Sequence, residues 1–398
     1  MTIGIIREGK NPPDKRVPFS PEQAALLHHK YGIKVLVQPS PVRCFTDEEY
    51  RSLGLTLQED LSDCDYLFGV KEVPTEQLIE RKKYFFFSHT IKEQPYNKKL
   101  MLSLLEKEIQ MIDYECLRNE KGQRLLGFGR YAGIVGAYNA LLAYGKRTGR
   151  FQLKPAHLCT NQDELQLELK QLSLHQEKIV LTGGGRVAKG VIELLTWAGI
   201  QQVSPSEFLS PSEGKAVFTN VDCEHYYAHQ DQPQFSYPHF FNHSSSYEVN
   251  FLPYLKQSDI FISGHFWDNV SLPLFTKEDV VAPDFKTQVI ADITCDIEGS
   301  VPTTLRATTI ADPLYHLDKQ TFSESDVISS NTLTVMSVDN LPCELPSDAS
   351  RDFGAALLKH IIPALIQGDP EQIILNASIC EKGKLTAPYH YLINFATP

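Results

Sequence analysis

The segment KIVLTGGGRVAKGVIELLTWAG, residues 178–199, constrains the fold more than any other part of the chain. It reads as a buried strand, a glycine turn and an amphipathic helix that begins near Arg186. Gly183 permits the tight turn, Gly185 lets the backbone approach a pyrophosphate, and Ala188 lets the helix pack on the strand. An ordinary turn can also be rich in glycine. With a strand before it and a helix after it, however, this segment predicts a dinucleotide-binding fold whose helix N-terminus faces the phosphates.

The residues that follow this helix bear on the choice of cofactor. An acidic residue usually lies about 20 residues after the glycine turn and accepts hydrogen bonds from the ribose 2′-hydroxyl. The segment QQVSPSEF, residues 201–208, occupies that place. Ser204 stands where the acid is expected, and the first acidic residue, Glu207, comes three positions later. A 2′-phosphate would meet less repulsion here, and Ser204, Ser206 and Arg186 are candidate partners for it. The sequence therefore favours NADP over NAD by a small margin.

The rest of the chain predicts two α/β domains, because 398 residues suit two domains of roughly 150–250 residues each. In the first domain, expected strands at 3–7, 34–38, 66–70 and 84–88 alternate with expected helices at 21–30, 75–81 and 97–108. A second series has expected strands at 178–182, 259–263, 287–292 and 334–338. Such alternation is typical of parallel sheets covered by helices. We therefore expect two Rossmann-like parallel-sheet domains with an active-site cleft between them.

The domain boundaries follow from two further segments. The stretch Gly127–Tyr144 is rich in glycine and alanine, which suits close helix packing, and we place the domain junction there. The segment after residue 341 contains an expected helix at 348–366 that is expected to cross back to the first domain. The substrate domain would then comprise 1–130 and 341–398, and the dinucleotide-binding domain 131–340.

Composition excludes several classes of function. The net charge of −11 argues against nucleic acid as a partner, because a nucleic-acid interface needs a face dominated by Lys and Arg. Eight cysteines without CxxC pairs indicate reduced thiols, and neither a metal site nor a disulfide framework is expected. The N-terminus meets charged residues at once, and no run approaches the ~20 apolar residues that span a bilayer. We expect a cytoplasmic protein with small-molecule partners and no membrane.

Three residues of the first domain are candidates for acid–base chemistry. Lys71 and Glu72 follow the strand YLFGV, and His89 follows the strand YFFFS. Taken alone, Lys71 is more simply explained as a solvated residue at a strand end, and His89 as a hydrogen-bonded histidine of a loop. Together, a lysine and a histidine after adjacent parallel strands can form an acid–base pair, since burial and neighbouring cations lower the pKa of lysine.

Three more charged residues have two open interpretations. Glu115 follows the strand-like run QMID and either tunes Lys71 or His89 or is a surface carboxylate. Arg16 and Arg124 lie at transitions from polar to apolar sequence, where a guanidinium can be held for bidentate binding of a carboxylate. As isolated arginines they would be surface charges.

Blocks along nearly the whole chain resemble successive signatures of the lysine-forming saccharopine dehydrogenases. They are REGKNPPDKRVPFSP, GVKEVP, FFSHTIKEQ, IDYE, GFGRYAG, ITCDIEGS and SVDNLP. The family is related to alanine dehydrogenase and transhydrogenase domains. FFSHTIK, QEDLSD, GGGRVAKG and SVDNLPCELPSDAS are most similar to the lysine-ketoglutarate reductase half of the bifunctional lysine-degrading enzyme. The resemblance implies an oxidoreductase that interconverts saccharopine with L-lysine and 2-oxoglutarate. Those reductases use NADPH, whereas the fungal stand-alone enzymes use NAD.

The resemblance also implies roles for individual residues. Lys71 would be the general base and His89 the general acid, with Glu72 and Glu115 adjusting them. Positions that match substrate contacts are Arg16, Lys92, Gln94, Arg124, Phe128, Thr294, Cys295 and Asp296. The cofactor contacts, taken from the resemblance and from the glycine turn together, are Gly183, Gly185, Arg186, Val187, Ala188, Ser204, Ser206, Phe266, Val338, Asp339, Asn340 and Leu341.

The chain departs from the fungal pattern at three places. Fungal members carry an arginine pair where this chain has Gln123 and Arg124, and an aspartate where it has the segment 201–208. A cysteine pair that forms a disulfide in some fungal members is replaced by Val187 and Gly264, so no regulatory disulfide is expected.

Two other functions remain open at this stage. One is an alanine-dehydrogenase-like enzyme that aminates a small 2-oxo acid with ammonia. The other is a non-catalytic NAD(P)-binding sensor, although a sensor would need neither the lysine–histidine pair nor the two arginines. The direction of the reaction, a homodimeric state and a separate enzyme acting on saccharopine are also left open by the sequence.

Overall fold

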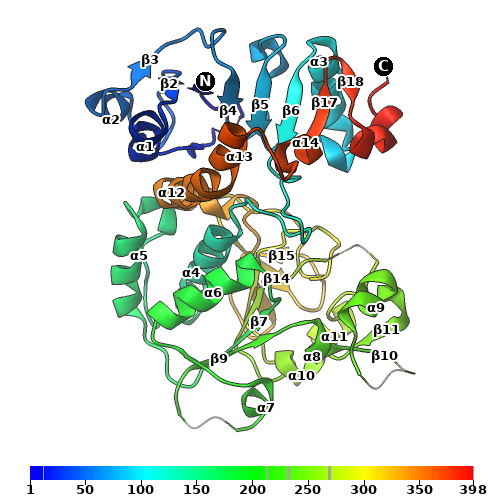
Figure 1. Ribbon diagram of the computed structural model, residues 1–398. Coiled ribbons are helices and arrows are strands. Elements are labelled where there is room, and N and C mark those ends of the chain that lie inside the picture. Colours follow the sequence, from blue (N-terminus) through cyan, green and yellow to red (C-terminus); the bar gives the residue numbers. More distant parts are fainter. Residues whose placement is uncertain (12, 212–213, 230, 232–233, 268–269, 398) are drawn as a thin grey trace. The chain divides into compact units, whose positions relative to one another are not determined.

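The computed structural model describes residues 1–11, 13–211, 214–229, 231, 234–267 and 270–397. The chain divides into two compact units (Figure 1). The first unit combines Met1–Phe128 with Pro346–Pro398, and the second is Gly129–Leu345. Among the described residues, each unit is built around an eight-stranded sheet. The boundaries predicted from the sequence, after residues 130 and 340, lie within five residues of these divisions.

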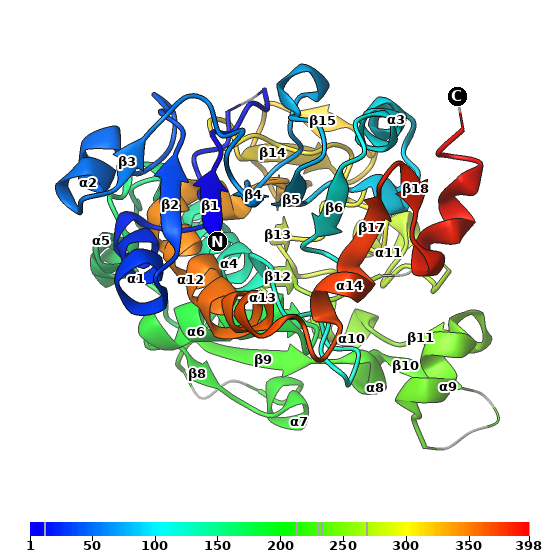
Figure 2. The ribbon, with the colours of Figure 1, turned by 45° about the horizontal axis from the view of Figure 1, so that its top comes forward.

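The sheet of the first unit has the strand order β18-β17-β6-β5-β4-β1-β2-β3. Its strands are β1 (Thr2–Ile5), β2 (Lys34–Val37), β3 (Thr56–Leu57), β4 (Tyr66–Phe68), β5 (Lys83–Phe86), β6 (Gln110–Asp113), β17 (Ser378–Glu381) and β18 (Lys384–Leu385). The strands from β6 to β3 run parallel, whereas β17 is antiparallel to both β6 and β18. Figure 2 shows β17, in red, beside β6 although the two are far apart in sequence. The C-terminal segment therefore completes the sheet of the first unit.

Helices cover both faces of this sheet. They are α1 (Pro21–Tyr31), α2 (Asp47–Ser52), α3 (Lys98–Glu106), α12 (Pro346–Ala356), α13 (Ile362–Gln367) and α14 (Ile373–Ala377), with a π-helical turn (Leu357–Ile361) between α12 and α13. Shorter 3-10 turns are η1 (Thr75–Gln77), η2 (Thr90–Lys92), η3 (Pro95–Asn97) and η9 (Ala387–Ile393). One core joins α1, α12, α13 and α14 to apolar side chains such as Ile3 and Phe68, and the other joins α3 and η9 to Leu67 and Met111. The strands are thus buried on both faces, as expected of a parallel sheet.

The helix expected at 75–81 is wrong, because the chain forms only the short turn η1 there. Leu78 leaves the turn in an extended conformation and is buried in the second core. Side chains form the hydrogen bonds that these backbone groups would otherwise make within a helix. Lys107 Nζ donates to the Leu78 carbonyl at 2.9 Å, and Ile79 N donates to Tyr84 Oη at 2.8 Å. Tertiary contacts therefore override the local helical pattern.

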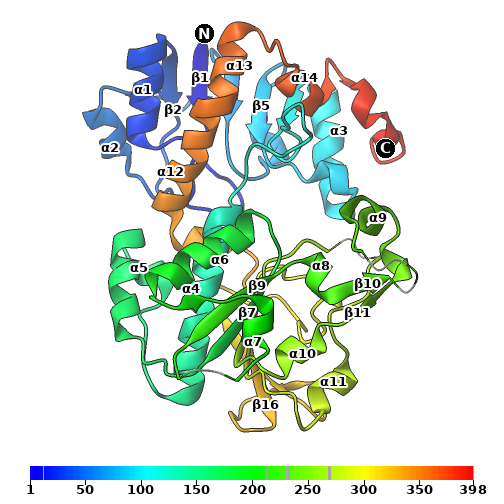
Figure 3. The ribbon, with the colours of Figure 1, turned by 60° about the horizontal axis from the view of Figure 1, so that its bottom comes forward.

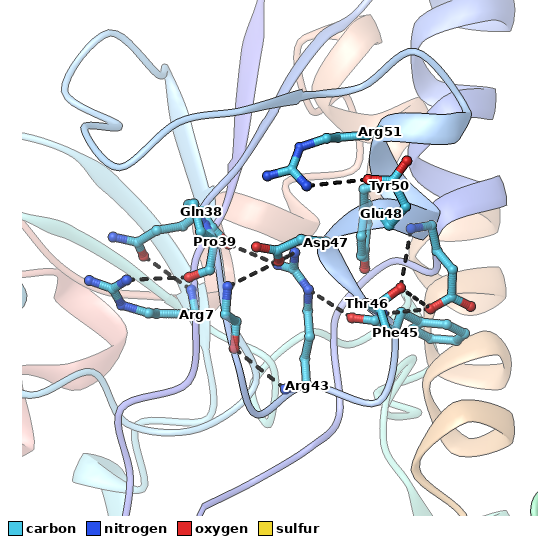
Figure 4. A network of polar contacts seen from close by, with 12 residues as sticks. Arg7, Gln38, Pro39, Arg43, Phe45, Thr46, Asp47, Glu48, Tyr50 and Arg51 are labelled. Atoms are coloured by element: carbon cyan, nitrogen blue, oxygen red, sulfur yellow. Dashed lines mark hydrogen bonds and ion pairs between the residues drawn. The ribbon is translucent and has the colours of Figure 1, made fainter.

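A buried arginine holds the loop that follows β2 (Figure 4). Arg43 donates to the carbonyl of Gln38 at 2.8 Å and to that of Phe45 at 3.0 Å, and it pairs with Asp47. Arg7, which follows β1, donates to the carbonyl of the neighbouring Pro39. These contacts fix the loops at the carboxyl end of β1 and β2, and this is the edge of the sheet that carries the candidate site.

The sheet of the second unit has the order β15-β14-β16-β13-β12-β7-β9-β8. Its strands are β7 (Lys178–Thr182), β8 (Gln201–Gln202), β9 (Val217–Val221), β12 (Ile260–Ser263), β13 (Val289–Asp292), β14 (Leu314–Asp318), β15 (Glu324–Ser325) and β16 (Thr332–Met336). β10 (Tyr227–His229) and β11 (Tyr247–Val249) form a small antiparallel pair. In the large sheet only β14 runs against the other strands, because it pairs antiparallel with both β15 and β16. The predicted α/β class with two parallel-dominated sheets is confirmed, with antiparallel strands added at one edge of each sheet.

The longest described helix of the second unit packs closely on the helix of the glycine motif. The helices are α4 (Gly129–Thr148), α5 (Gln162–Glu168), α6 (Arg186–Trp197), α7 (Pro205–Phe208), α8 (Cys223–Tyr226), α9 (Tyr237–Asn242), α10 (Leu252–Leu255) and α11 (Lys277–Val281), with 3-10 turns η4 (Ala156–Leu158), η5 (Leu169–Gln171), η6 (Ser244–Ser246) and η7 (Leu341–Glu344). Figure 3 shows α4 beside α6. A Cβ at Gly190 would overlap the carbonyl oxygen of Arg130, and a Cβ at Gly133 would lie 2.8 Å from Val191 N. The expectation that the small residues of α4 serve close helix packing is confirmed.

None of the helices in the described ranges combines the length and the apolar character that crossing a bilayer requires.

Candidate active site and cofactor site

Charged side chains gather at the carboxyl edge of the first unit's sheet. β6, β5, β4 and β1 are consecutive parallel neighbours. Glu8 follows β1, Lys71 and Glu72 follow β4, His89 follows β5, and Glu115 follows β6. Ends of parallel strands meet at one edge of a sheet, where ligands of α/β folds bind. The predicted lysine and histidine therefore do follow adjacent parallel strands.

Glu72 orients the imidazole of His89. Its Oε1 lies 2.5 Å from His89 Nδ1, and both side chains are largely buried. Burial alone would raise the pKa of Glu72, but the hydrogen bond and charge of His89 outweigh it and bring the pKa of Glu72 down to about 2. His89 has a left-handed backbone with φ of +54°, which is uncommon for a residue other than glycine. An imidazole held by a carboxylate at one ring nitrogen is set up to exchange protons through the other.

Lys71 lies in surroundings that favour its neutral form. Burial lowers the pKa of Lys71, and the positive charges of Arg16 and Lys10 lower it further. The side-chain oxygens of Glu8 accept hydrogen bonds from Val70 N at 2.7 Å and Lys71 N at 2.8 Å. This pair of bonds fixes the start of the loop that carries Lys71. A lysine with a lowered pKa can act as a general base closer to neutral pH than an exposed lysine.

Glu8 was missed by the sequence analysis. Desolvation raises the pKa of this carboxyl to about 8, and the negative charge of Asp14 adds to the effect. The signal that would have found it is the one used for Lys71 and His89, since Glu8 also follows a parallel strand of this sheet.

The two predicted arginines lie on one aromatic cluster, defined by Phe87, Tyr114, Phe128 and Phe353. The guanidinium of Arg16 lies 4.2 Å from the centroid of Phe128, and that of Arg124 lies 5.5 Å from the centroid of Phe87. Arg16 is only 3% exposed, which excludes its reading as a surface charge. The predicted Phe128 is thus part of the support for Arg16.

The arginines differ in the partners that they already have. Arg16 forms a bidentate pair with Asp14, with N–O distances of 3.0 and 2.6 Å. Arg124 makes a longer contact of 3.4 Å with Glu115, which also lies 3.9 Å from Lys92 Nζ. The Nε of Arg124 has no hydrogen-bond partner among the described residues. Lys92, Glu115 and Arg124 are therefore brought together.

Asp113 holds the two loops that carry His89 and Glu115. This buried carboxylate accepts hydrogen bonds from Ser88 N at 2.9 Å, from Ser88 Oγ at 2.5 Å and from Glu115 N at 2.7 Å. The sequence did not single it out, because Asp113 is the last residue of β6 and its contact with Ser88 depends on the neighbouring strand β5. Gln94, by contrast, is exposed and accepts a hydrogen bond from Tyr96 Oη.

The glycine turn of the second unit has the geometry that a pyrophosphate requires. Gly183 has φ of +103°, and a Cβ there would lie 2.6 Å from the carbonyl oxygen of Gly264. A Cβ at Gly185 would meet nothing within 4 Å, so that side of the turn is open. Arg186 is the first residue of α6, and Ala188 is 1% exposed against the sheet. The open turn and the helix N-terminus fit a dinucleotide phosphate.

Other predicted cofactor residues line the same carboxyl edge of the second sheet. Phe266 follows β12 and is 83% exposed. Its neighbour His265 is held by Thr182 Oγ1 at 2.6 Å and Ser300 Oγ at 2.8 Å, and burial lowers the pKa of His265 to about 4, so this ring is neutral. Val187 lies in α6, where its carbonyl faces Gly133 of α4.

Two predicted loops of the second unit contact each other. Thr294, Cys295 and Asp296 follow β13, and residues 338–341 follow the neighbouring β16. Cys295 Sγ lies 3.2 Å from the carbonyl oxygens of Asp292 and Val338. Thr294 Oγ1 donates to the Asp292 carboxylate, whereas Asp296 is exposed. In the second loop Val338 and Leu341 are buried, Asp339 is exposed, and Asn340 Nδ2 lies 3.0 Å from Cys343 Sγ.

The strand order does not place Ser204 beside the glycine strand, where the NADP preference expected it. β9 pairs with β7 along its whole length, and β8 pairs only with β9. The segment 201–208 therefore follows an edge strand and not the neighbour of β7. Ser204 serves as the N-cap of α7, since its Oγ accepts from Glu207 N while Glu207 Oε2 accepts from Ser204 N at 2.9 Å; Ser206 lies in the same short helix.

Known proteins match this chain along nearly all of its length. The family described as "Alanine dehydrogenase/PNT, N-terminal domain" matches residues 4–135. The mitochondrial alpha-aminoadipic semialdehyde synthase of Mus musculus is 30% identical over 98% of this chain and 47% of its own length. A saccharopine dehydrogenase [NAD(+), L-lysine-forming] of Yarrowia lipolytica is 26% identical over 84% of each chain. The chain is a homologue of the lysine-forming saccharopine dehydrogenases.

This homologue spans about half the length of the animal and plant relatives it matches; in Arabidopsis thaliana the share is 41%. Among solved structures, an L-alanine dehydrogenase superposes with a TM-score of 0.66 at 15% identity and covers all of both chains. A transhydrogenase from Sinorhizobium meliloti gives a TM-score of 0.61 at 12% identity. These structures show the fold, and the family match over residues 4–135 agrees with the expected relationship to alanine dehydrogenase and transhydrogenase domains.

Proposed function

We propose that the chain interconverts saccharopine with L-lysine and 2-oxoglutarate, using a nicotinamide dinucleotide. The observation that carries the proposal is the arrangement of Lys71, Glu72 and His89 at one edge of the first sheet. A lysine with a lowered pKa beside a carboxylate-held imidazole is suited to moving protons between nitrogen and oxygen atoms of a substrate. The names of the relatives support the same reaction.

Lys71 and His89 divide the proton transfers in this proposal. The ε-amine of the substrate lysine must be neutral to attack the keto carbon of 2-oxoglutarate, so Lys71 Nζ accepts its proton. His89 then donates a proton to the oxygen that leaves as water when the imine forms. Glu72 keeps the ring of His89 in place through Nδ1 during this transfer. The bound nucleotide supplies the hydride that reduces the imine.

The arginines and Lys92 bind carboxylates in this proposal. Saccharopine carries three carboxylates, while the chain as a whole is negative, so cations must be concentrated locally. Arg124 is best placed, because its contact with Glu115 is long and its Nε has no partner among the described residues. Arg16 is rigidly held by Asp14 and Phe128, and it acts chiefly by lowering the pKa of Lys71.

The glycine turn of the second unit binds the nucleotide in this proposal. Gly183 and Gly185 leave room for the pyrophosphate, and the first turn of α6 directs its amides toward it. Phe266 and the loops after β13 and β16 are proposed to contact the rest of the nucleotide. The sequence-based preference for NADP used Ser204, Ser206 and Arg186 as partners of a 2′-phosphate, beside the resemblance to NADPH-using reductases. Ser204 follows the edge strand β8 and adds no support to that preference.

The experiment that tests the proposal is an assay of NADH and NADPH oxidation. We expect oxidation only when L-lysine and 2-oxoglutarate are both present, with saccharopine detected by mass spectrometry. Ammonium with pyruvate is the matched control, because an alanine-dehydrogenase-like enzyme would use that pair. Oxidation that proceeds with ammonium and not with lysine would reject the proposal in favour of that alternative. Nucleotide binding without turnover on either pair would favour a sensor.

A further inference from the structure

A carboxylate that no sequence motif indicates lies directly beside the glycine turn. Asp222 follows β9, the strand that pairs with β7, and the register places Val221 opposite Thr182. Gly183 N donates to the Val221 carbonyl at 2.8 Å, and Asn220 Nδ2 donates to the Gly183 carbonyl at 2.8 Å. The last two residues of β9, Asn220 and Val221, are therefore both hydrogen-bonded to Gly183.

The glycine at the centre of the turn gives this carboxylate its space. A Cβ at Gly184 would overlap Asp222 Oδ2, so only glycine allows the two to approach. The other oxygen, Oδ1, accepts a hydrogen bond from Cys223 N at 2.8 Å. The side chain is half-buried. Asp222 is thus held with Oδ2 toward the turn, and both Gly183 and Gly184 lie where a side chain would overlap a neighbouring atom.

The chemistry of this position concerns the ribose of adenosine. In dinucleotide-binding folds, an acidic residue usually about 20 residues after the glycine turn accepts hydrogen bonds from the ribose hydroxyls. Asp222 comes later in the chain, but it follows the strand that pairs with the glycine strand. A 2′-phosphate in the same place would bring two or nearly two negative charges against the carboxylate. Both the lost hydrogen bonds and the repulsion disfavour the phosphorylated nucleotide.

We propose that Asp222 holds the adenosine ribose and makes the chain select NAD(H) over NADP(H). The proposal rests on the proposed function in one respect, namely that a nicotinamide dinucleotide binds at this turn. It reverses the preference that the sequence suggested. The sequence analysis expected the residue that contacts the ribose to follow β8. In the sheet, however, the strand beside β7 is β9.

The test measures equilibrium binding of NADH and NADPH to the full chain, with the fluorescence of the nucleotide as the signal. We expect the wild type to bind NADH at least about 10- to 100-fold more tightly, the range that a charge-assisted hydrogen bond provides. Asp222→Asn should weaken NADH binding about 10-fold and bring NADPH binding closer to it. Glu224→Gln is the matched control, because it removes the same charge from an exposed position of α8 two residues away.

Three results would overturn the proposal: equal or tighter binding of NADPH by the wild type, an unchanged NADH-to-NADPH ratio in Asp222→Asn, or a specific loss of NADPH binding in Ser204→Ala. The wild-type ratio needs no variant, so it decides even if Asp222→Asn fails to fold. If both nucleotides bind and lysine-dependent turnover holds while the ratio favours NADPH, this inference fails and the proposed function stands. If neither nucleotide binds, both fail.

Discussion

The proton-transfer chemistry is set by a few contacts of single residues. His89 depends on Glu72 for its orientation and on Asp113, through Ser88, for the position of its loop. Lys71 depends on burial and on the positive charges of Arg16 and Lys10. These contacts lie within one unit and can be tested one side chain at a time.

Replacing His89 should affect turnover and not folding. His89→Gln is expected to lower kcat by about 10²- to 10⁴-fold, because the amide cannot donate and recover a proton as imidazole does. Steady-state kinetics with lysine and 2-oxoglutarate measure the effect. His29→Gln, at an exposed position of α1, is the control and should leave kcat unchanged. An unaltered kcat in His89→Gln would remove this residue from the mechanism.

The pKa of Lys71 predicts a shift in the pH profile. Lysine acts as a base only when neutral, so the acidic limb of kcat/KM should report a group that titrates below the ordinary ~10.4 of lysine. Lys10→Met removes one of the charges that lower the pKa of Lys71. The pKa should rise, and the acidic limb should move to higher pH. A limb that stays in place, or moves to lower pH, would show that Lys71 is not the titrating base.

Close helix packing at the element scale makes a prediction about stability. A methyl group at Gly190 of α6 would overlap the backbone of Arg130 in α4. Gly190→Ala should therefore reduce the free energy of unfolding by about 1–3 kcal/mol, despite the higher helix propensity of alanine. Urea denaturation measures the difference. Lys189→Ala, at the exposed neighbouring position, should change stability little. A stabilised Gly190→Ala would mean that the helices can separate freely.

Elements with a strong pattern could be predicted from the sequence, and their order in the sheet could not. The strand Lys178–Thr182 and the start of α6 at Arg186 came from an apolar run and a glycine turn. The position of β9 beside β7 could not be read, because β8 comes first along the chain and strand order depends on long-range pairing. Asp222 was missed for that reason alone.

The candidate catalytic residues could be predicted because chain direction fixes where parallel strands end. Lys71 and His89 needed only the strands before them and the resemblance. The contacts that position Lys71 and lower its pKa could not be predicted. The hydrogen bond from Lys71 N to Glu8 and the proximity of Arg16 to Lys71 both depend on segments that are distant in sequence. The C-terminal strand β17 was not expected either, although it completes the first sheet.

At the scale of the whole molecule, the first unit is made of two distant parts of the chain. β17 pairs with β6, and Ile379 and Cys380 are fully buried between α3 and η9. The second unit is continuous in sequence and carries the glycine turn. The two proposed activities, proton transfer and nucleotide binding, therefore belong to separately built units.

Truncation should separate these two activities. A chain that ends at Gly368 loses α14, β17 and β18, which leaves β6 exposed beside the loop of Glu115. We expect lysine-dependent turnover to be lost while the fluorescence titration still detects nucleotide binding by the second unit. The full-length chain is the control in both assays. Retained turnover in the shortened chain would contradict the assignment of β17 to the catalytic unit.

The most direct test of the central claim compares the wild type with Lys71→Met for the rate of saccharopine formation at saturating nucleotide. Lys99→Met, at an exposed position of α3, serves as the control. The account predicts saccharopine from the wild type and the control, and a rate lower by about 10²- to 10⁴-fold in Lys71→Met with nucleotide binding unchanged. Saccharopine formed equally fast by Lys71→Met, or not formed by the wild type, would contradict it.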